Sequence, residues 1–315
     1  MKPAPEHNDP FLTRAFSPML FHETEPFDSD DYIFELKMDG IRALAYLDNN
    51  QTVLINKRGK DVTQNYPELA TMHRQSQKRA VIDGELVVFT KGKPDFFRLQ
   101  RRSLLVDKLK IKLSSAGYPV TFVTFDLLYC DHETVTDKPL LERKKRLNQI
   151  IKENNQIVVS RYIETKGIDF FNLAKKENLE GVVAKEKNSR YYSGKRCDVW
   201  LKIKVYQEED LVICGYIPKE SGSIKDLILG EYDQNGRLSE KVKINTTKNQ
   251  KVILDFAATF PAEPLFLTSD DNAVWMKPYL VGTVSYMMKT TSGGLRQPVF
   301  KGVSTDKVAS DLLKS

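Results

Sequence analysis

Alternating apolar and polar positions recur along the first two-thirds of the chain and predict a fold rich in β-strands. The segment YIFELKMDGIRALAYL at 32–47 has two strand-like runs around an Asp-Gly pair, which is a strong turn signal, so we expect a hairpin. TVLIN at 52–56 predicts another strand, and RAVIDGELVVF at 79–89 predicts a second strand pair around its own Asp-Gly. TFVTFDLLYC at 121–130 is typical of a buried strand.

Three segments have the spacing or composition of helices. PLLERKKRLNQII at 139–151 repeats apolar residues at near-helical spacing with charges opposite, which predicts a surface helix. PELATMHRQSQ at 67–77 also reads as helical. RLQRRSLLVDKLKIK at 98–112 carries six basic side chains and one acid, and two interpretations stay open: a solvated amphipathic helix or a surface that follows phosphates.

The character of the chain changes after residue 205. Beyond it, short apolar runs separated by glycines and polar turns are typical of a small all-β barrel. We therefore predict an α+β protein, with a domain of antiparallel sheets and helices at 1–205 and an all-β domain at 206–315.

Composition narrows the class of protein. The chain has 315 residues, 41% of them hydrophobic, and 48 basic against 42 acidic side chains, so we expect a globular protein with an anionic partner. No apolar run of about 18 residues and no basic-then-apolar leader is present, so neither a membrane span nor a signal peptide is expected. Three scattered cysteines and four histidines argue against disulfides or zinc and favour the reducing cytoplasm.

Lys37 raises the first question about chemistry, because it stands beside the Asp-Gly pair at the end of a strand. Taken alone, it is a lysine that guards a strand edge or a nucleophile. A nucleophilic lysine must be neutral, which requires nearby cations or partial burial. Glu35 lies two residues earlier and therefore points to the same face of the strand.

Five motifs in a fixed order favour the nucleophile. In this order they resemble the covalent nucleotidyltransferases, and they are KMDGIR at 37–42, DGE at 83–85, FDLLY at 125–129, EGVVAK at 180–185 and WLKIK at 200–204. The tail at 274–307 resembles the end of an ATP-dependent DNA ligase of the bacterial end-joining type. The resemblance implies a nucleotidyltransferase domain with ATP-grasp-like antiparallel sheets, followed by an OB-fold barrel.

The same resemblance implies an activity and its cofactors. AMP would pass from ATP to Lys37, then to a DNA 5′-phosphate, and would leave when the nick is sealed, with Mg²⁺ (or Mn²⁺) assisting. Residues implied to act on the phosphates are Lys37, Arg42, Lys185 and Lys202. Residues implied to hold the nucleotide further include Glu35 on the adenine amino edge, Glu85 on the ribose, Phe125 stacked on adenine, and Arg196; Glu85 and Glu180 are the candidate metal ligands.

The resemblance also implies partners. We expect nicked double-stranded DNA as the substrate, a monomeric enzyme, and help from a Ku-like end-binding protein. Basic residues expected to contact DNA are Lys57, Arg58, Arg101, Arg102 and Arg296. Trp200 is expected to serve packing, and Asp39 to orient the turn or assist the metal.

Two departures from the family pattern stand out. Ser304 occupies a position where close relatives carry an arginine that orients pyrophosphate, which puts the first step in question. Lys57 replaces an arginine, so it keeps the charge but loses the bidentate fork. Two alternatives to a DNA ligase therefore remain: an RNA ligase or capping-type nucleotidyltransferase, and a catalytically impaired scaffold bound to DNA. Whether the role is repair or phage replication stays open.

Overall fold

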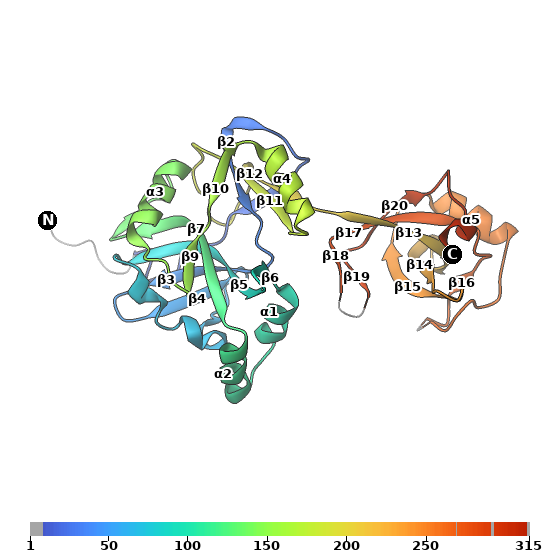
Figure 1. The fold of residues 1–315 in the computed structure, drawn as a ribbon, viewed down its shortest axis with the longest axis horizontal. Coiled ribbons are helices and arrows are strands. Elements are labelled where there is room, and N and C mark those ends of the chain that lie inside the picture. Colours follow the sequence, from blue (N-terminus) through green and yellow to red (C-terminus); the bar gives the residue numbers. More distant parts are fainter. Residues whose placement is uncertain (1–8, 269, 291–292, 314–315) are drawn as a thin grey trace. The chain divides into compact units, whose positions relative to one another are not determined.

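The computed structural model describes residues 9–268, 270–290 and 293–313 (Figure 1). Positions 291 and 292 of the tail motif lie outside the described residues. The chain divides into two compact units, Met1–Val205 and Tyr206–Ser315. Within the described ranges, no helix is both long enough and apolar enough to cross a bilayer.

The first unit contains a five-stranded sheet whose strands come from both ends of the unit. Its order is β1 (Leu20–Glu23), β12 (Arg196–Lys204), β11 (Gly181–Glu186), β2 (Ser29–Leu36) and β10 (Tyr162–Thr165). Only β1 and β12 pair in parallel; the other neighbours are antiparallel. Helix α4 (Gly167–Lys176) covers one face, where its Ala174 packs in the same cluster as Phe34 and Val182.

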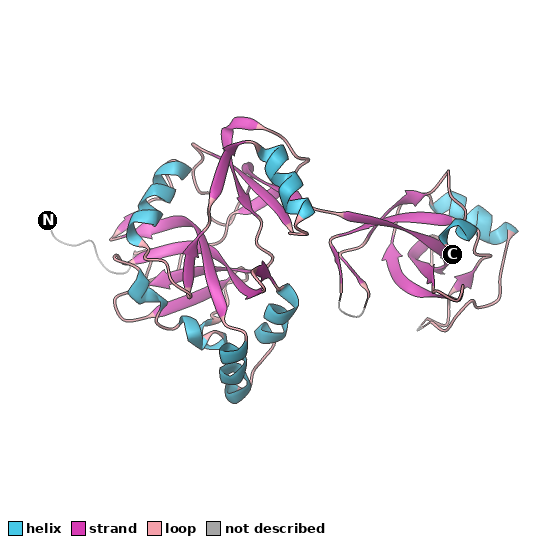
Figure 2. Cartoon of the chain, in the orientation of Figure 1, coloured by secondary structure: helices cyan, strands magenta, loops and turns pink. Residues whose placement is uncertain are grey.

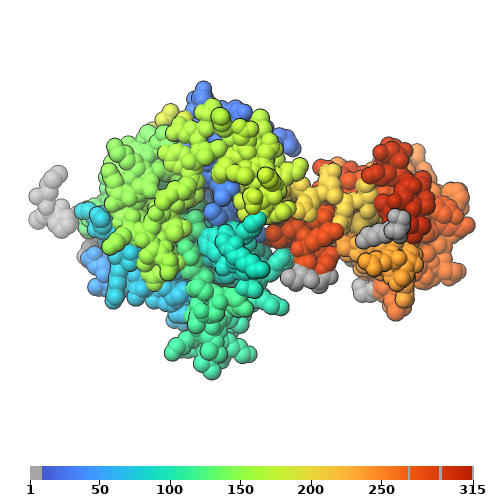
Figure 3. Space-filling view, viewed as in Figure 1, coloured from blue at the N-terminus to red at the C-terminus, as the bar shows by residue number. Residues whose placement is uncertain are grey.

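A second sheet of seven strands completes this unit. Its main order is β4 (Thr52–Asn56), β3 (Ile41–Leu47), β5 (Ala80–Thr90), β7 (Val120–Cys130) and β8 (Glu133–Thr134), with β6 (Lys93–Pro94) beside β5 and β9 (Ile157–Val159) beside β7. Three helices accompany it: α1 (Phe96–Ser103), α2 (Lys108–Gly117) and α3 (Leu140–Ile150). Figure 3 shows that α2 protrudes from the surface of the unit. Antiparallel sheets with helices confirm the predicted α+β class.

The two hairpins predicted around Asp-Gly pairs are wrong. The segment 32–47 forms β2 and β3, which lie in different sheets, and residues 80–89 of the second segment belong to the single strand β5. A Cβ on Gly40 would lie 2.3 Å from the Leu86 carbonyl oxygen, and one on Gly84 would lie 2.5 Å from the Phe122 ring. Both glycines therefore permit close packing of neighbouring strands rather than a hairpin turn.

The three segments predicted to be helical differ in their observed structure. The surface helix at 139–151 is confirmed as α3. The basic stretch at 98–112 breaks into α1 and α2, because Asp107 caps a new helix by accepting a hydrogen bond from the Lys110 amide. The segment 67–77 forms only two short 3₁₀ helices, Pro67–Leu69 and Met72–Gln75, with Pro67 opening the first.

The second unit is built mainly of strands, as Figure 2 shows. Its six-stranded antiparallel sheet comprises β15 (Leu238–Asn245), β14 (Ile224–Tyr232), β13 (Gln207–Pro218), β17 (Val281–Tyr286) and β20 (Val299–Val303), with β16 (Val274–Trp275) beside β13. A separate pair consists of β18 (Met288–Lys289) and β19 (Leu295–Arg296). Helix α5 (Gln250–Thr259) buries Ile253 and Ala257 in the core of this β domain.

Candidate active site

Side chains from the sequence motifs meet at a pocket in the first unit, to which both sheets contribute. Its lining residues are Phe21, Glu35, Leu36, Lys37, Met38, Glu85, Phe125, Ser160, Val183 and Lys185. Strand register explains part of this gathering. Glu35 on β2 and Lys202 on β12 both stand opposite Val183 on the central strand β11, so these three side chains share one face. In the other sheet, Arg42 on β3 stands opposite Glu85 on β5.

Lys37 follows directly after β2 and lines this pocket. Its backbone amide donates a hydrogen bond of 2.9 Å to the Gly181 carbonyl, which anchors the residue to the start of β11. Its Nζ lies 2.8 Å from Glu180 Oε1, and the two side chains are 20% and 8% exposed. The amine is therefore accessible from the pocket and faces a single buried carboxylate at salt-bridge distance.

Glu35 lies in a deeper, almost fully enclosed ion cluster. Its Oε1 is 2.6 Å from Lys144 Nζ and its Oε2 is 3.2 Å from Lys185 Nζ, and none of the three side chains is more than 3% exposed. Lys185 Nζ also lies 4.2 Å from the Phe125 ring centroid and 4.1 Å from that of Trp200. Burial lowers the pKa of Lys185 to about 8, although Glu35 opposes the shift.

Arg42 is held by a network of its own. Its Nε and Nη2 donate to Asp83 at 3.0 and 2.6 Å, and Tyr191 donates to the same carboxylate at 2.6 Å. Asp83 is fully buried. Burial opposes the charge of Arg42, yet Asp83 keeps its pKa above the ordinary value. The guanidinium lies 4.7 Å from the Phe21 ring centroid and 5.3 Å from that of Phe125, so its position is tightly defined.

Further cations surround Arg42. Burial lowers the pKa of Lys57, and the positive charges of Arg42, Arg196 and Lys202 lower it further. Lys57 is thus close enough to be repelled by each of these three cations. Such a concentration of positive charge is what a polyphosphate requires.

Lys204 belongs beside these cations and was missed from the sequence. Glu23 Oε2 lies 3.3 Å from Lys202 Nζ and 3.6 Å from Lys204 Nζ, so one carboxylate on β1 serves both lysines. The signal was present in the sequence, because WLKIK places its two lysines two residues apart and therefore on one face of a strand.

The structure distributes the predicted phosphate-binding residues over two places. Arg42 and Lys202 lie in the cation group, together with Arg196, whose Nη1 donates to the Phe21 carbonyl. Lys185 lies instead in the buried cluster with Glu35. Trp200 is fully buried against Phe21, Phe125 and Tyr191, as expected of a packing residue.

Two carboxylates lie near Lys37: Glu180 is its salt-bridge partner, and Glu85 lines the same pocket. Burial raises the pKa of Glu85 to about 8, against the opposing charges of Lys37 and Arg42, and Glu180 adds to the rise. Among the described residues, no cluster of three or more metal-ligating side chains occurs. Magnesium commonly takes one or two carboxylates together with phosphate oxygens and water, so this carboxylate pair fits that requirement.

The raised pKa of Glu85 predicts a measurable pH dependence of stability. Between about pH 4.5 and 8 the folded protein keeps a proton on Glu85 that the unfolded chain releases, so this residue makes the free energy of unfolding fall as pH rises through that range. Urea unfolding of Glu85→Gln, which cannot titrate, should lack this component of the fall. The exposed Glu25→Gln serves as control and should follow the wild type at every pH. If the free energy of unfolding falls with pH equally in the wild type and in Glu85→Gln, the raised pKa of Glu85 is contradicted.

The residues predicted to contact DNA are not equally available. Lys57, Arg58 and Arg101 are exposed. Arg102 is only 2% exposed, pairs with Glu68 and donates 2.8 Å to the Tyr118 carbonyl, so the prediction that it contacts DNA is wrong. Its burial places it on the inner side of α1. Arg296 lies on β19 in the second unit and is partly exposed.

Two further predictions concern single residues. Asp39 is 5% exposed and therefore enclosed by the protein. Ser304 follows β20, and its Oγ donates 2.7 Å to Asp306 while its amide donates to the Val281 carbonyl. Its part in orienting pyrophosphate stays a prediction.

Comparison with known proteins adds an independent line of evidence. A family model described as the ATP dependent DNA ligase domain matches residues 10–204, and one described as the ATP dependent DNA ligase C terminal region matches 220–307. The SPbeta prophage-derived DNA ligase-like protein LigB of Bacillus subtilis is 32% identical over 290 residues, which cover 90% of this chain and 97% of that protein. The multifunctional non-homologous end joining protein LigD of Mycobacterium bovis is 29% identical, and the match spans 91% of this chain but 38% of that protein.

Solved structures agree with these matches. The ligase domain of Mycobacterium tuberculosis LigD is 27% identical, with a TM-score of 0.56 over 96% of this chain and 99% of that one. A structure of a Lig E DNA ligase, at 18% identity, has a TM-score of 0.62 over 91% of this chain and 99% of that one, which is a likeness of fold.

Proposed function

Because this chain belongs to the family of ATP-dependent DNA ligases, we propose that it seals nicks between a 3′-hydroxyl and a 5′-phosphate through a lysyl-AMP on Lys37. The observation that carries the proposal is the position of Lys37. It lines the pocket, its Nζ lies 2.8 Å from Glu180, and a group of cations stands next to Glu85 and Arg42.

The first step joins the Lys37 nitrogen to the α-phosphorus of ATP. An N–P bond forms, the bond from the α-phosphorus to the bridging oxygen breaks, and pyrophosphate leaves. Glu180 is positioned to receive the proton that the amine must lose. Arg42, Lys202 and Lys204 offset the charge that develops on the phosphate oxygens.

The remaining steps pass the activated AMP on. An oxygen of the DNA 5′-phosphate attacks the α-phosphorus and the N–P bond breaks, which returns Lys37. The 3′-hydroxyl then attacks the phosphorus of the 5′-phosphate, loses its proton, and AMP leaves with the bridging oxygen. Binding AMP first as a phosphoramidate therefore supplies the leaving group that a bare 5′-phosphate lacks.

Nucleoside recognition is assigned to the pocket walls. Phe125 and Val183 both line the pocket and offer apolar surfaces to the two faces of adenine. Glu35 would accept from the adenine amino group and Glu85 from a ribose hydroxyl. Support for Glu35 comes from its place in the lining of the same pocket as Lys37 and Phe125.

Glu85 and Glu180 would hold Mg²⁺ or Mn²⁺ together with the nucleotide phosphates. When bound, such an ion supplies positive charge to the phosphate oxygens. At neutral pH the proton on Glu85 must be displaced for it to ligate, so added metal should lower the pH at which this residue ionises.

DNA binding should depend on salt, because Lys57, Arg58 and Arg101 are exposed cations suited to phosphates. Raising the salt from about 50 to about 200 mM should weaken affinity for a nicked duplex by tenfold or more in a gel-shift assay. Arg101→Ala should reduce both the affinity and the salt slope, whereas Arg102→Ala should lower stability instead. Affinity that does not change with salt would contradict a phosphate-bound substrate.

The alternatives give different results in a substrate comparison. Preference for GTP over ATP, or for nicked RNA over nicked DNA, would favour the capping-type or RNA-ligase alternative. Tight nick binding without any adduct would favour the impaired scaffold that Ser304 raises. The active enzyme is supported by Lys37 and Glu85, which line one pocket, by Glu180, which pairs with Lys37, and by Arg42, which stands opposite Glu85.

The biological setting is the least constrained part of the proposal. We place the enzyme in DNA repair, acting as a cytoplasmic monomer with an OB-fold as its second domain and aided by a Ku-like end-binding protein. Support comes from the match to proteins named for non-homologous end joining, of which this chain spans 38% in the mycobacterial examples. Stimulation of end joining by added Ku, with no stimulation of simple nick sealing, would test it.

A further inference from the structure

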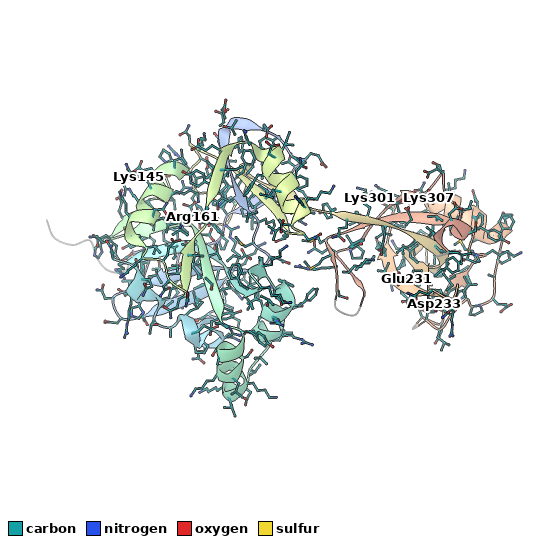
Figure 4. The ribbon with its side chains drawn as sticks, in the orientation of Figure 1. Lys145, Arg161, Glu231, Asp233, Lys301 and Lys307 are labelled. Carbon is teal, nitrogen blue, oxygen red and sulfur yellow. The ribbon has the colours of Figure 1, made fainter. Side chains whose placement is uncertain are left out.

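Helix α3 buries two consecutive basic residues inside the first unit. Arg143 donates two hydrogen bonds of 2.8 Å to Asp126 on β7, and both side chains are fully buried. Lys144 reaches Glu35 on β2, 2.6 Å away. The next residue, Lys145, is exposed on the outer face of the helix (Figure 4). Lys144 belongs to none of the five motifs. Only 2% of its surface is exposed, and a lysine is rarely buried so completely unless it has a partner.

We propose that Lys144 is a positioning residue for purine selection: it holds Glu35 in place as the acceptor for the 6-amino group of adenine. This inference rests on the proposed function, in particular on the assignment of Glu35 to the adenine edge. It adds a residue from outside the nucleotide pocket to the determinants of specificity.

Adenine and guanine differ in the hydrogen-bonding group at position 6 of the purine. An ionised carboxylate only accepts hydrogen bonds, so it binds the 6-amino group of adenine and repels the 6-oxo group of guanine. A protonated carboxyl can donate a hydrogen bond, and it would donate one to the 6-oxo oxygen of guanine. Selection of ATP over GTP therefore depends on holding the Glu35 carboxylate against the purine edge, at a depth where only 2% of it is exposed.

Lys185 alone is the weaker partner for Glu35. Its contact with Glu35 is the longer one, 3.2 Å against 2.6 Å for Lys144. Lys185 is also shared with the faces of Phe125 and Trp200. Because burial lowers its pKa to about 8, it loses part of its charge in mildly alkaline solution. Lys144 therefore supplies this buried carboxylate with a second and closer cation.

The geometry leaves Glu35 able to serve a ligand as well. Oε1 lies 2.6 Å from Lys144 Nζ and Oε2 lies 3.2 Å from Lys185 Nζ, and Glu35 lines the pocket at the same time. Tyr162, whose Cα stands opposite Glu35 on the neighbouring strand, lies with its ring 5.4 Å from Lys144 Nζ and confines the amine from the other side. Lys144 therefore contacts Glu35 and this ring, and its charge also acts on the neighbouring Lys185.

The test compares ATP with GTP on the same preparation of each variant. Transfer of the labelled nucleotide to protein gives kcat/KM for each, and their ratio does not depend on the fraction of protein that is folded. Lys144→Met should lower the ATP-to-GTP ratio by about tenfold or more. Lys144→Arg, which keeps a cation, should restore most of the ratio, and Lys145→Met, the same change one residue along, should leave it unchanged.

Two outcomes would overturn the inference. One is a ratio in Lys144→Met within twofold of the wild type; the other is an equal loss of the ratio in Lys144→Arg, which would indicate a packing role. If the proposed function itself is wrong, the wild type forms no adduct with either nucleotide, which distinguishes the two failures.

Discussion

Replacing Lys37 with alanine is expected to abolish transfer of AMP to the protein while sparing the sealing of a nick that already carries 5′-adenylate. The reason is chemical: Lys37 supplies the nitrogen of the phosphoramidate but no atom of the final phosphodiester. Its loss also removes the 2.8 Å salt bridge to Glu180, while Arg42 and Lys202 stay in the site.

Gel assays with labelled ATP and with a pre-adenylylated nick separate the two reactions. We expect a loss of adduct by at least about a thousandfold, as for removal of a covalent nucleophile. Lys145→Ala removes an exposed lysine from the same unit and should behave as wild type in both assays. Normal adduct formation by Lys37→Ala would exclude Lys37 as the nucleophile.

Replacing Asp83 with alanine should cost both stability and activity. Asp83 is fully buried, receives two hydrogen bonds from Arg42 and one from Tyr191, and its removal leaves a buried guanidinium without its carboxylate. Breaking a buried pair in this way costs about 3–5 kcal/mol. Arg42 would also lose the orientation that the first step requires, so adduct formation should fall by more than the fraction unfolded.

Urea unfolding and single-turnover adenylylation together test this expectation. The control is Asp61→Ala, which removes a half-exposed carboxylate that lies 3.5 Å from Arg14. Surface pairs of this kind contribute little, so stability should change by less than about 1 kcal/mol. Equal stability losses at Asp83 and Asp61 would mean that the Arg42 network does not organise the site.

Most of the strands could be read from the sequence, because alternation reports directly on a half-buried strand. Pairing could not be read in the same way. The segment 32–47 contains two good strands and a good turn signal, yet β2 joins β11 and β10 while β3 joins β4 and β5. Local turn propensity is a weak force, and the close approach of Gly40 to Leu86 that overrides it arises only when distant strands come together.

The site was predictable where motifs carried it and not elsewhere. Lys37, Arg42, Glu85 and Lys202 came from ordered motifs that also implied the nucleotidyltransferase fold, and the family matches confirm that implication. Lys144 carried no signal, since a basic residue on an amphipathic helix normally faces water. Its burial depends on meeting Glu35, more than a hundred residues away in the chain.

The prediction that Arg102 contacts DNA was wrong for the opposite reason. It stands in the most basic stretch of the chain, where a DNA contact is a reasonable expectation, but its guanidinium is used inside the fold by Glu68 and by the carbonyls of Asn65 and Tyr118. Charge in a sequence reports on exposure only on average. The structure distinguishes Arg101, which is exposed, from Arg102, which is not.

The most direct test of the account is the mass of the purified protein after treatment with pyrophosphate, then with ATP and Mg²⁺, followed by peptide mapping. Pyrophosphate removes any AMP carried through purification, so that new adduct can be seen. The account predicts a gain of one AMP per chain, located on Lys37 and labile to a second dose of pyrophosphate. No gain in mass, or AMP on a different residue, would contradict it.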